Sequence, residues 1–246
     1  MSNNHHIAAS AKSLSNGQHT LTAAEDLLSN NLGQFGTILA DPPWQFTNRT
    51  GKMAPEHRRL LRYPTLTLDD ILSLPVAELS LPQSHLYLWV PNALILEGLE
   101  VMKRWGFTYK TNLVWYKIRK DGGPDGRGVG FYFRNVTELV LFGTRGSLRT
   151  LAPGRRQVNI ISSQKREHSR KPDELYTVIE RCSPGPYLEL FARRSRQGWK
   201  QWGNEIADDI CAPELWNDEA QVNNKPIHIT SAAQYPITYA AKGKDN

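Results

Sequence analysis

The feature of the sequence that most constrains its fold is a repeated alternation of short apolar segments with helical patterns. The apolar segments predict short buried strands at residues 36–40, 85–90, 111–116, 137–142, 157–161 and 187–191. Helical patterns cover residues 92–105 and 172–182, and a third pattern over residues 66–80 is interrupted by Pro75. Strands separated by helices indicate an α/β fold, in which a mostly parallel sheet is flanked by helices on both faces.

The length and composition favour one main domain. We expect a disordered N-terminal segment at residues 1–20, a folded domain at residues 21–210 and a polar tail at residues 211–246. No apolar run approaches the roughly 20 residues that span a bilayer, and the first residues lack the apolar core of a secretory signal. Cys182 and Cys211 lack the number and spacing of a disulfide framework or metal site, so a reducing, cytoplasmic setting is expected.

Basic residues gather in two stretches of the chain, whose formal net charge is +6. Residues 145–171 contain a single acid, Glu167, among many arginines and lysines, and a second basic run covers residues 48–63. Either run alone is typical of a solvated surface loop. Because the two runs flank the motif described next, we favour a polyanionic partner.

The sequence ILADPPWQF, at residues 38–46, leaves an apolar strand through two consecutive prolines. Each proline fixes its own φ, and Pro43 also holds Pro42 in an extended conformation. The turn therefore presents the Asp41 carboxylate and the Pro42 carbonyl oxygen, with the indole face of Trp44 beside them. A planar base fits this arrangement, because its exocyclic amine meets the two oxygens while its ring stacks on Trp44. Such stacking contributes about 1–3 kcal/mol. The alternative is a strand-ending turn with a core tryptophan.

Several motifs in order resemble one family. The tetrapeptide Asp-Pro-Pro-Trp, the segment LYLWV at residues 86–90 and the segment SRKPDELYTVIERCSPG at residues 169–185 are similar to the MT-A70 family of S-adenosylmethionine-dependent adenine-N6 methyltransferases. The resemblance runs from about Leu32 to Ile206. It implies a Rossmann-like methyltransferase fold, in which the DPPW element precedes the cofactor-binding strand.

The resemblance also implies a role for individual residues. The proposed catalytic residues are Asp41, Pro42, Pro43 and Trp44. Hydrogen bonds from the substrate amine to the first two would localise the N6 lone pair for attack on the cofactor's methyl group. The expected cofactor-binding residues are Asp41, Lys171, Glu189, Phe191, Arg193, Asn204 and Glu205. The expected substrate-binding residues are Tyr63, Glu138 and Lys171, to which the basic run adds Arg155 and Arg156. No metal is required.

Structural alternatives stay open for some of these residues. Glu189 is also typical of a buried ion pair, and Asn204 and Glu205 of a helix cap. The chain carries Ser195 and Arg196 where RNA-modifying members of the family have His and Asn. Upstream, Asp26 is a candidate contact for the cofactor's adenine.

The resulting expectation is an enzyme that methylates N6 of adenine in DNA, because the chain lacks the extensions of the RNA-modifying members. The alternatives are an RNA adenine-N6 methyltransferase and a catalytically inert nucleic-acid-binding partner subunit. Methylation of a small molecule or of protein glutamine is disfavoured by the basic runs. A homodimer, or a heterodimer with a paralogue, is the expected assembly, with no membrane association.

Overall fold

The computed structural model describes residues 22–30, 32–45, 65–126, 132–164 and 170–203. They all lie in one compact unit, Met1–Ala207, and the second unit, Asp208–Asn246, falls outside the described residues. The expected disordered segment at residues 1–20 and the whole expected polar tail at residues 211–246 are likewise outside the described part of the chain.

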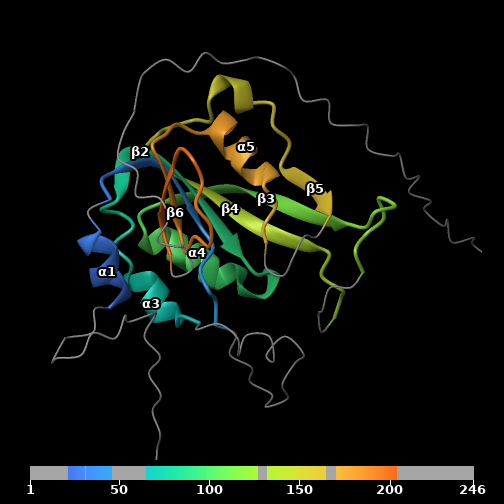
Figure 1. Cartoon of the computed structure of the whole chain (residues 1–246), viewed down its shortest axis with the longest axis horizontal. Helices are drawn as coiled ribbons and strands as arrows, with labels where there is room; N and C mark the ends of the chain where they lie inside the picture. The colour runs from blue at the N-terminus through green and yellow to red at the C-terminus, as the bar shows by residue number, and fades with distance from the viewer. Residues whose placement is uncertain (1–21, 31, 46–64, 127–131, 165–169, 204–246) are drawn as a thin grey trace, which may run out of the picture. The chain divides into compact units, whose positions relative to one another are not determined.

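A seven-stranded sheet in the order β5-β3-β4-β2-β1-β6-β7 forms the centre of the fold (Figure 1). The strands are β1 (Phe35–Ala40), β2 (Ser80–Val90), β3 (Thr108–Ile118), β4 (Thr137–Arg145), β5 (Ile160–Gln164), β6 (Tyr187–Leu190) and β7 (Trp199–Trp202). β4 runs antiparallel to β2 and β3, and the other neighbouring pairs are parallel. The prediction of a mostly parallel sheet is therefore confirmed.

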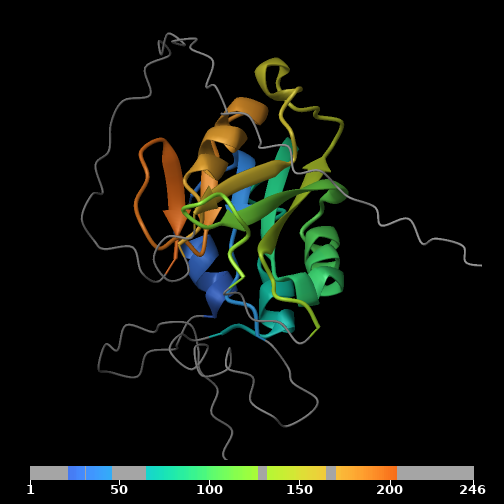
Figure 2. The same cartoon turned by 90° about the vertical axis from the view of Figure 1, so that its right-hand side faces the viewer.

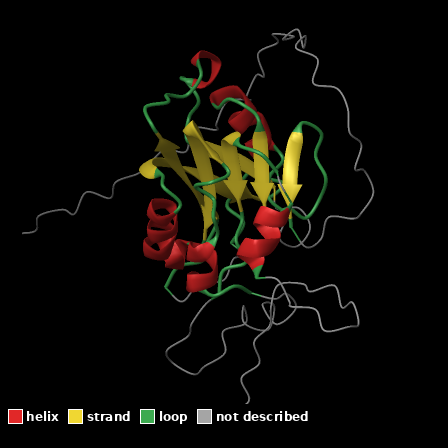
Figure 3. Ribbon diagram, turned by 90° about the vertical axis from the view of Figure 1, so that its left-hand side faces the viewer, coloured by secondary structure: helices red, strands yellow, loops and turns green. Residues whose placement is uncertain are grey.

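Helices pack on both faces of this sheet (Figure 3). The α-helices are α1 (Ala23–Ser29), α3 (Leu68–Ser73), α4 (Ile95–Arg104) and α5 (Glu174–Cys182), and the 3-10 turns are η1 (Asn92–Leu94) and η2 (Ala152–Gly154). α1, α3 and α4 contribute to one hydrophobic cluster and α5 to the other. The central strands supply both clusters by alternation: Ile38 and Ala40 belong to the first, and Leu39 belongs to the second. This three-layer arrangement confirms the Rossmann-like α/β fold.

The predicted helices differ from the observed ones where local signals compete. The pattern over residues 66–80 forms only α3, because Leu74 adopts an extended conformation before Pro75. The apolar stripe predicted for residues 172–182 is confirmed, since its members Leu175, Val178, Ile179 and Cys182 are buried. Three elements, α1, β7 and the turn η2, were not predicted. α1 begins with a capping box, in which Thr22 and Glu25 exchange hydrogen bonds.

Within the described residues, no helix has the length and apolarity needed to cross a membrane.

Candidate active site

The candidate site lies at the edge of the sheet where the parallel strands end. Asp41 directly follows β1, and Glu189 is the third residue of the neighbouring strand β6. Because β4 runs in the opposite direction, its second residue, Glu138, lies at this same edge opposite Trp115 of β3. Three acids that are far apart in the sequence are thus brought to one edge, as expected for ligand binding in such sheets.

The proline turn is held by its own backbone hydrogen bonds. The Trp44 N–H donates to the Pro42 carbonyl oxygen at 2.8 Å, and the Leu66 N–H donates to the Pro43 carbonyl oxygen at 3.0 Å. The Pro42 oxygen was expected to accept from a substrate amine, and one of its two lone pairs is already engaged in this structure. Asp41 itself has a side chain that is 25% exposed.

Trp44 occupies the core and does not offer an open stacking face. Its side chain belongs to the cluster beneath the sheet and the residue is 6% exposed. The indole N–H donates to the Trp89 carbonyl oxygen at 2.9 Å, which fixes the ring against the end of β2. The expected stacking platform is therefore corrected for this structure: the indole supports the turn from below, as in the alternative of a core tryptophan.

Four charged side chains form an alternating network at the site. The Lys171 ammonium lies 3.2 Å from Asp41 Oδ1 and 3.1 Å from Glu138 Oε2. The other Glu138 oxygen, Oε1, accepts a hydrogen bond from the Lys117 ammonium. We call Asp41, Lys171, Glu138 and Lys117 the charge network. The negative charges of its two acids and the positive charges of its two lysines cancel.

The lysines of the charge network also rest on aromatic rings. The Lys171 ammonium lies 4.5 Å from the ring centroid of Trp89, and the Lys117 ammonium lies 4.9 Å from that of Trp115. The faces of these rings attract the cations. The rings therefore restrict where each ammonium group sits.

Opposite charges shift the proton equilibria of the network. Burial alone would raise the pKa of Glu138, but the charges of Lys171 and Lys117 outweigh burial and lower this pKa to about 2. Burial would lower the pKa of Lys171, yet Asp41 and Glu138 raise it. Glu138 and Lys171 are consequently ionised at neutral pH.

Glu189 behaves in the opposite way. Burial raises its pKa to about 7, and the nearby charge of Asp41 adds to the effect. The Tyr176 hydroxyl of α5 donates to Glu189 Oε1 at 2.8 Å, and Gln201 of β7 donates a further hydrogen bond. The carboxylate thus receives hydrogen bonds from a hydroxyl and an amide, and the positive charge of Arg196 acts against the rise of its pKa. A carboxyl group that titrates near neutral pH at a strand end is typical of a binding site.

The chain turns sharply after β6. Phe191 has a positive φ of 64°, which is uncommon for a residue other than glycine. Its ring packs edge-on against Trp202 of β7 at a centroid distance of 5.3 Å. The Trp202 indole N–H in turn donates to Asp26 Oδ2 at 2.7 Å. The Asp26 carboxylate, a candidate contact for the cofactor's adenine, thus ties α1 to the end of β7, close to Phe191.

Of the remaining predicted site residues, one is exposed to solvent and three lie outside the described residues. Arg193 is exposed just after Phe191. Tyr63, Asn204 and Glu205 lie outside the described residues.

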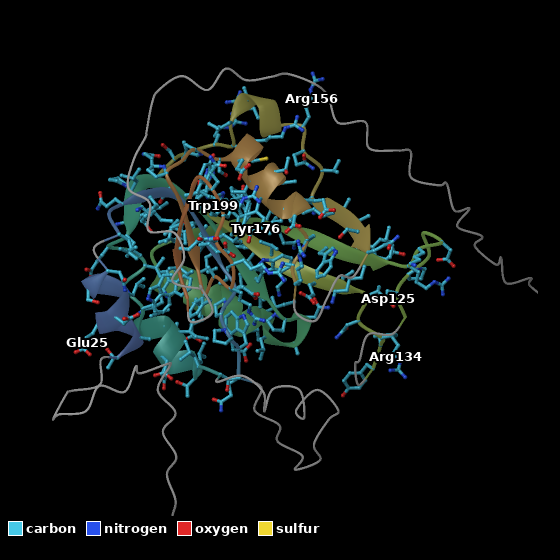
Figure 4. The ribbon with its side chains drawn as sticks, in the orientation of Figure 1. Glu25, Asp125, Arg134, Arg156, Tyr176 and Trp199 are labelled. Carbon is cyan, nitrogen blue, oxygen red and sulfur yellow. The ribbon has the colours of Figure 1, made fainter. Side chains whose placement is uncertain are left out.

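Arg155 and Arg156, which were expected among the substrate-binding residues, do not lie beside Asp41. Both are exposed and adjoin η2, where the Leu151 N–H donates to the Cys182 carbonyl oxygen at the C-terminal end of α5. Figure 2 shows η2, in yellow, at the top of the view beyond α5. In Figure 4 Arg156 lies at the opposite end of the view from Arg134, a residue of the segment that leads into β4. The end of α5 precedes β6, so this arginine pair lies at the edge of the sheet opposite Asp41.

The sequence patterns missed Lys117, Tyr176 and Gln201. Lys117 and Gln201 lie on observed strands outside the quoted motifs, and Tyr176 lies within the segment at residues 169–185 but was given no role. A weak signal for Lys117 exists, because it follows Trp115 by two residues and so shares a strand face with it. Among the described residues there is no group of acids, histidines and cysteines that could hold a metal ion.

With this geometry in place, the relationship to known proteins is clear. The sequence model of MT-A70 matches residues 35–205, from the first residue of β1 to just beyond β7. The chain belongs to the MT-A70 family. The match includes the charge network and the β6 turn of this MT-A70 protein.

Individual MT-A70 relatives are matched over different shares of their length. A Medicago truncatula protein, named as an MT-A70-like N(6)-adenosine-methyltransferase, is 34% identical over 72% of this chain and 27% of the relative. The human N(6)-adenosine-methyltransferase catalytic subunit METTL3 is 31% identical over 71% of this chain and 29% of the relative. The type II methyltransferase M.MunI of a Mycoplasma species is 29% identical over 72% of this chain and 79% of the relative. The chain therefore spans less than a third of the first two relatives and most of the third.

Proposed function

We propose that this MT-A70 protein transfers a methyl group from S-adenosylmethionine to N6 of adenine in DNA. The observation that carries the proposal is the position of Asp41. It follows β1 at the carboxyl edge of the sheet, contacts Lys171 through Oδ1, and lies near enough to Glu189 on the adjacent strand to raise that residue's pKa. This edge combines a substrate acid with a second acid suited to a cofactor.

In the proposed reaction Asp41 holds the substrate amine. Its carboxylate accepts a hydrogen bond from the N6 amino group, and the second lone pair of the Pro42 carbonyl oxygen accepts another. These bonds reduce delocalisation of the nitrogen lone pair into the purine ring and orient that lone pair. When bound, S-adenosylmethionine supplies a methyl group on a positively charged sulfur, which leaves as a neutral thioether. Asp41 is also placed to accept the proton that N6 loses.

The residues after β6 fit the cofactor. Glu189 is partly buried, is held by hydroxyl and amide donors, and has a carboxylate that can accept hydrogen bonds from ribose hydroxyls. The positive φ of Phe191 turns the chain so that the following backbone leaves the sheet edge. Lys171 lies at Asp41, between the two halves of the proposed site, and orients the carboxylate of that acid.

DNA is favoured over RNA by the relative that is matched over most of its length, the type II methyltransferase M.MunI. The second candidate is RNA, because several relatives are named N(6)-adenosine-methyltransferases and adenosine is a ribonucleoside. An inert subunit is disfavoured, because the Asp-Pro-Pro-Trp sequence and the charge network around it are intact. Assembly as a homodimer, or with a paralogue, remains part of the proposal and can be measured by light scattering with and without DNA.

The experiment that tests the function is a labelled methyl transfer. The protein is incubated with methyl-labelled S-adenosylmethionine and with DNA and RNA pools of matched sequence, which are then digested to nucleosides. We expect label in N6-methyldeoxyadenosine. Label in N6-methyladenosine alone would show that the substrate is RNA and not DNA. Label in neither nucleoside would overturn the proposed activity.

A further inference from the structure

We propose that Lys117 is a positioning residue for methyl transfer, which acts through Glu138 to hold Lys171 against Asp41. The inference rests on the proposed function and deepens it. Lys117 belongs to no motif of the sequence, and its role follows from the geometry at the ends of β3 and β4.

Among the described residues, the Lys117 ammonium pairs with one acid, Glu138. The Lys117 side chain is 14% exposed, and its ammonium donates to Glu138 Oε1 while it rests on the ring of Trp115. A lysine placed for solubility or for binding phosphates would extend its ammonium into water. The burial, the hydrogen bond and the ring contact together direct this cation inward, towards the charge network.

Glu138 divides its two oxygens between two lysines. Oε1 accepts from Lys117 and Oε2 accepts from Lys171, so that each lysine occupies a separate oxygen. If Lys117 were neutral, Asp41 and Glu138 would compete for Lys171 alone. The freed Oε1 could also draw Lys171 towards Glu138, since a carboxylate without its second cation leaves an unbalanced charge in a partly buried site.

A displacement of Lys171 would change the orientation of the Asp41 carboxylate. Lys171 lies 3.2 Å from Asp41 Oδ1, and this contact orients the carboxylate that is proposed to hold the substrate amine. Catalytic groups are sensitive to displacements of about 1 Å, which can lower a rate by about 100-fold. Lys117 therefore sets the geometry of the reacting carboxylate from two side chains away.

The test uses the full chain with DNA that the wild-type protein methylates. Lys117→Met removes the charge and keeps the length of the side chain, while Lys117→Arg keeps the charge. Glu138→Gln and the double variant Lys117→Met/Glu138→Gln complete a double-mutant cycle. Lys110→Met, at an exposed position of the same strand, is the matched control.

We expect Lys117→Met to lower kcat by about 10- to 100-fold, with a smaller change in KM for DNA and cofactor. Lys117→Arg should recover most of the rate, and Lys110→Met should match the wild type. Because Lys117 acts through Glu138, adding Lys117→Met to Glu138→Gln should cause little further loss. Circular dichroism checks folding. If Lys117→Met does not fold, Lys117→Gln takes its place with the same expected loss.

Three results would overturn the role of Lys117 while the proposed function stands. These are a wild-type kcat in Lys117→Met, effects of Lys117→Met and Glu138→Gln that multiply, or a loss confined to KM for DNA, as for a phosphate contact. A wild-type protein that methylates no adenine in DNA or RNA would instead overturn the proposed function, and the role of Lys117 with it.

Discussion

At the scale of single residues, Glu189 shows how the site trades stability for binding. The carboxyl group has an ordinary pKa of 4.5 and a pKa of about 7 in the folded protein, because it is partly buried and lies near Asp41. The folded state therefore favours the neutral form. Its contribution to stability is fully present below the ordinary pKa and is lost as the pH rises through about 7. A carboxylate that receives ribose hydroxyls must be ionised, which is the costly form.

Replacing Glu189 with Gln separates these two effects. We expect the variant to be more stable than the wild type at about pH 8, by roughly 1–3 kcal/mol, and equally stable at about pH 4. We also expect weaker binding of S-adenosylmethionine, and loss of the rise in affinity between about pH 6 and pH 8. Urea unfolding and calorimetry measure the two quantities, with the exposed Glu100→Gln as control. Parallel pH dependences in Glu189→Gln and the wild type would show that this carboxyl does not titrate as described.

Trp44 supports the proline turn from the core and was expected to stack on the substrate base. Its indole is 6% exposed and donates to the Trp89 carbonyl oxygen. We expect Trp44→Ala to lower the free energy of unfolding by about 3–5 kcal/mol, because it removes a large core side chain. Tyr132→Ala, at a residue that is 95% exposed, should change it little. Urea denaturation measures the free energy of unfolding of both variants. A Trp44→Ala variant with wild-type stability and weakened DNA binding would show that the indole belongs to the base-binding surface.

At the scale of elements, α4 depends on a close approach to the sheet. A Cβ atom at Gly98 would lie 2.6 Å from Val90 Cγ2 and 2.8 Å from Val90 Cγ1, and Val90 ends β2 beside the site. Alanine is the better helix former by about 1 kcal/mol, so helix propensity alone would make Gly98→Ala stabilising. The close contact of the new methyl group with the Val90 side chain would instead destabilise the protein.

We expect the contact to prevail and Gly98→Ala to destabilise the protein by about 1–3 kcal/mol. Thermal or urea unfolding measures the change, and Glu100→Ala on the exposed face of α4 serves as the control for helix propensity. A more stable Gly98→Ala protein would mean that α4 and β2 can separate without cost.

At the scale of the whole molecule, the structure changes the expected path of a polynucleotide. Within the basic run at residues 145–171, Lys171 lies at the site, whereas Arg155 and Arg156 adjoin η2 at the opposite edge of the sheet. We therefore expect Arg155→Ala/Arg156→Ala to leave the salt dependence of DNA affinity unchanged. Titration of DNA at several salt concentrations measures the slope. A slope flattened by about one unit per lost phosphate contact would show that DNA reaches this edge.

Much of the fold was predictable, because period-two apolar runs and helix-end signals are local. β1, β2, β6 and α5 were found in this way. Asp41 was placed by the strand end that precedes it, and the role of Glu189 was implied by the resemblance to the family. The pairing of Lys117 with Glu138 was not predictable. It depends on β4 lying antiparallel beside β3, and that register comes from tertiary packing. β7 was missed because its short segment has two exposed or partly exposed central residues.

The most direct test of the central claim is the turnover of Asp41→Asn, which keeps the shape of the side chain and removes its charge. Methyl transfer to DNA is measured in a single turnover at saturating cofactor, with circular dichroism to confirm the fold and Asp69→Asn, an exposed acid of α3, as control. We expect a folded Asp41→Asn protein whose rate falls by at least about 100-fold, and an unchanged rate for Asp69→Asn. A folded Asp41→Asn protein that methylates adenine at close to the wild-type rate would contradict the assignment of this edge of the sheet as the active site.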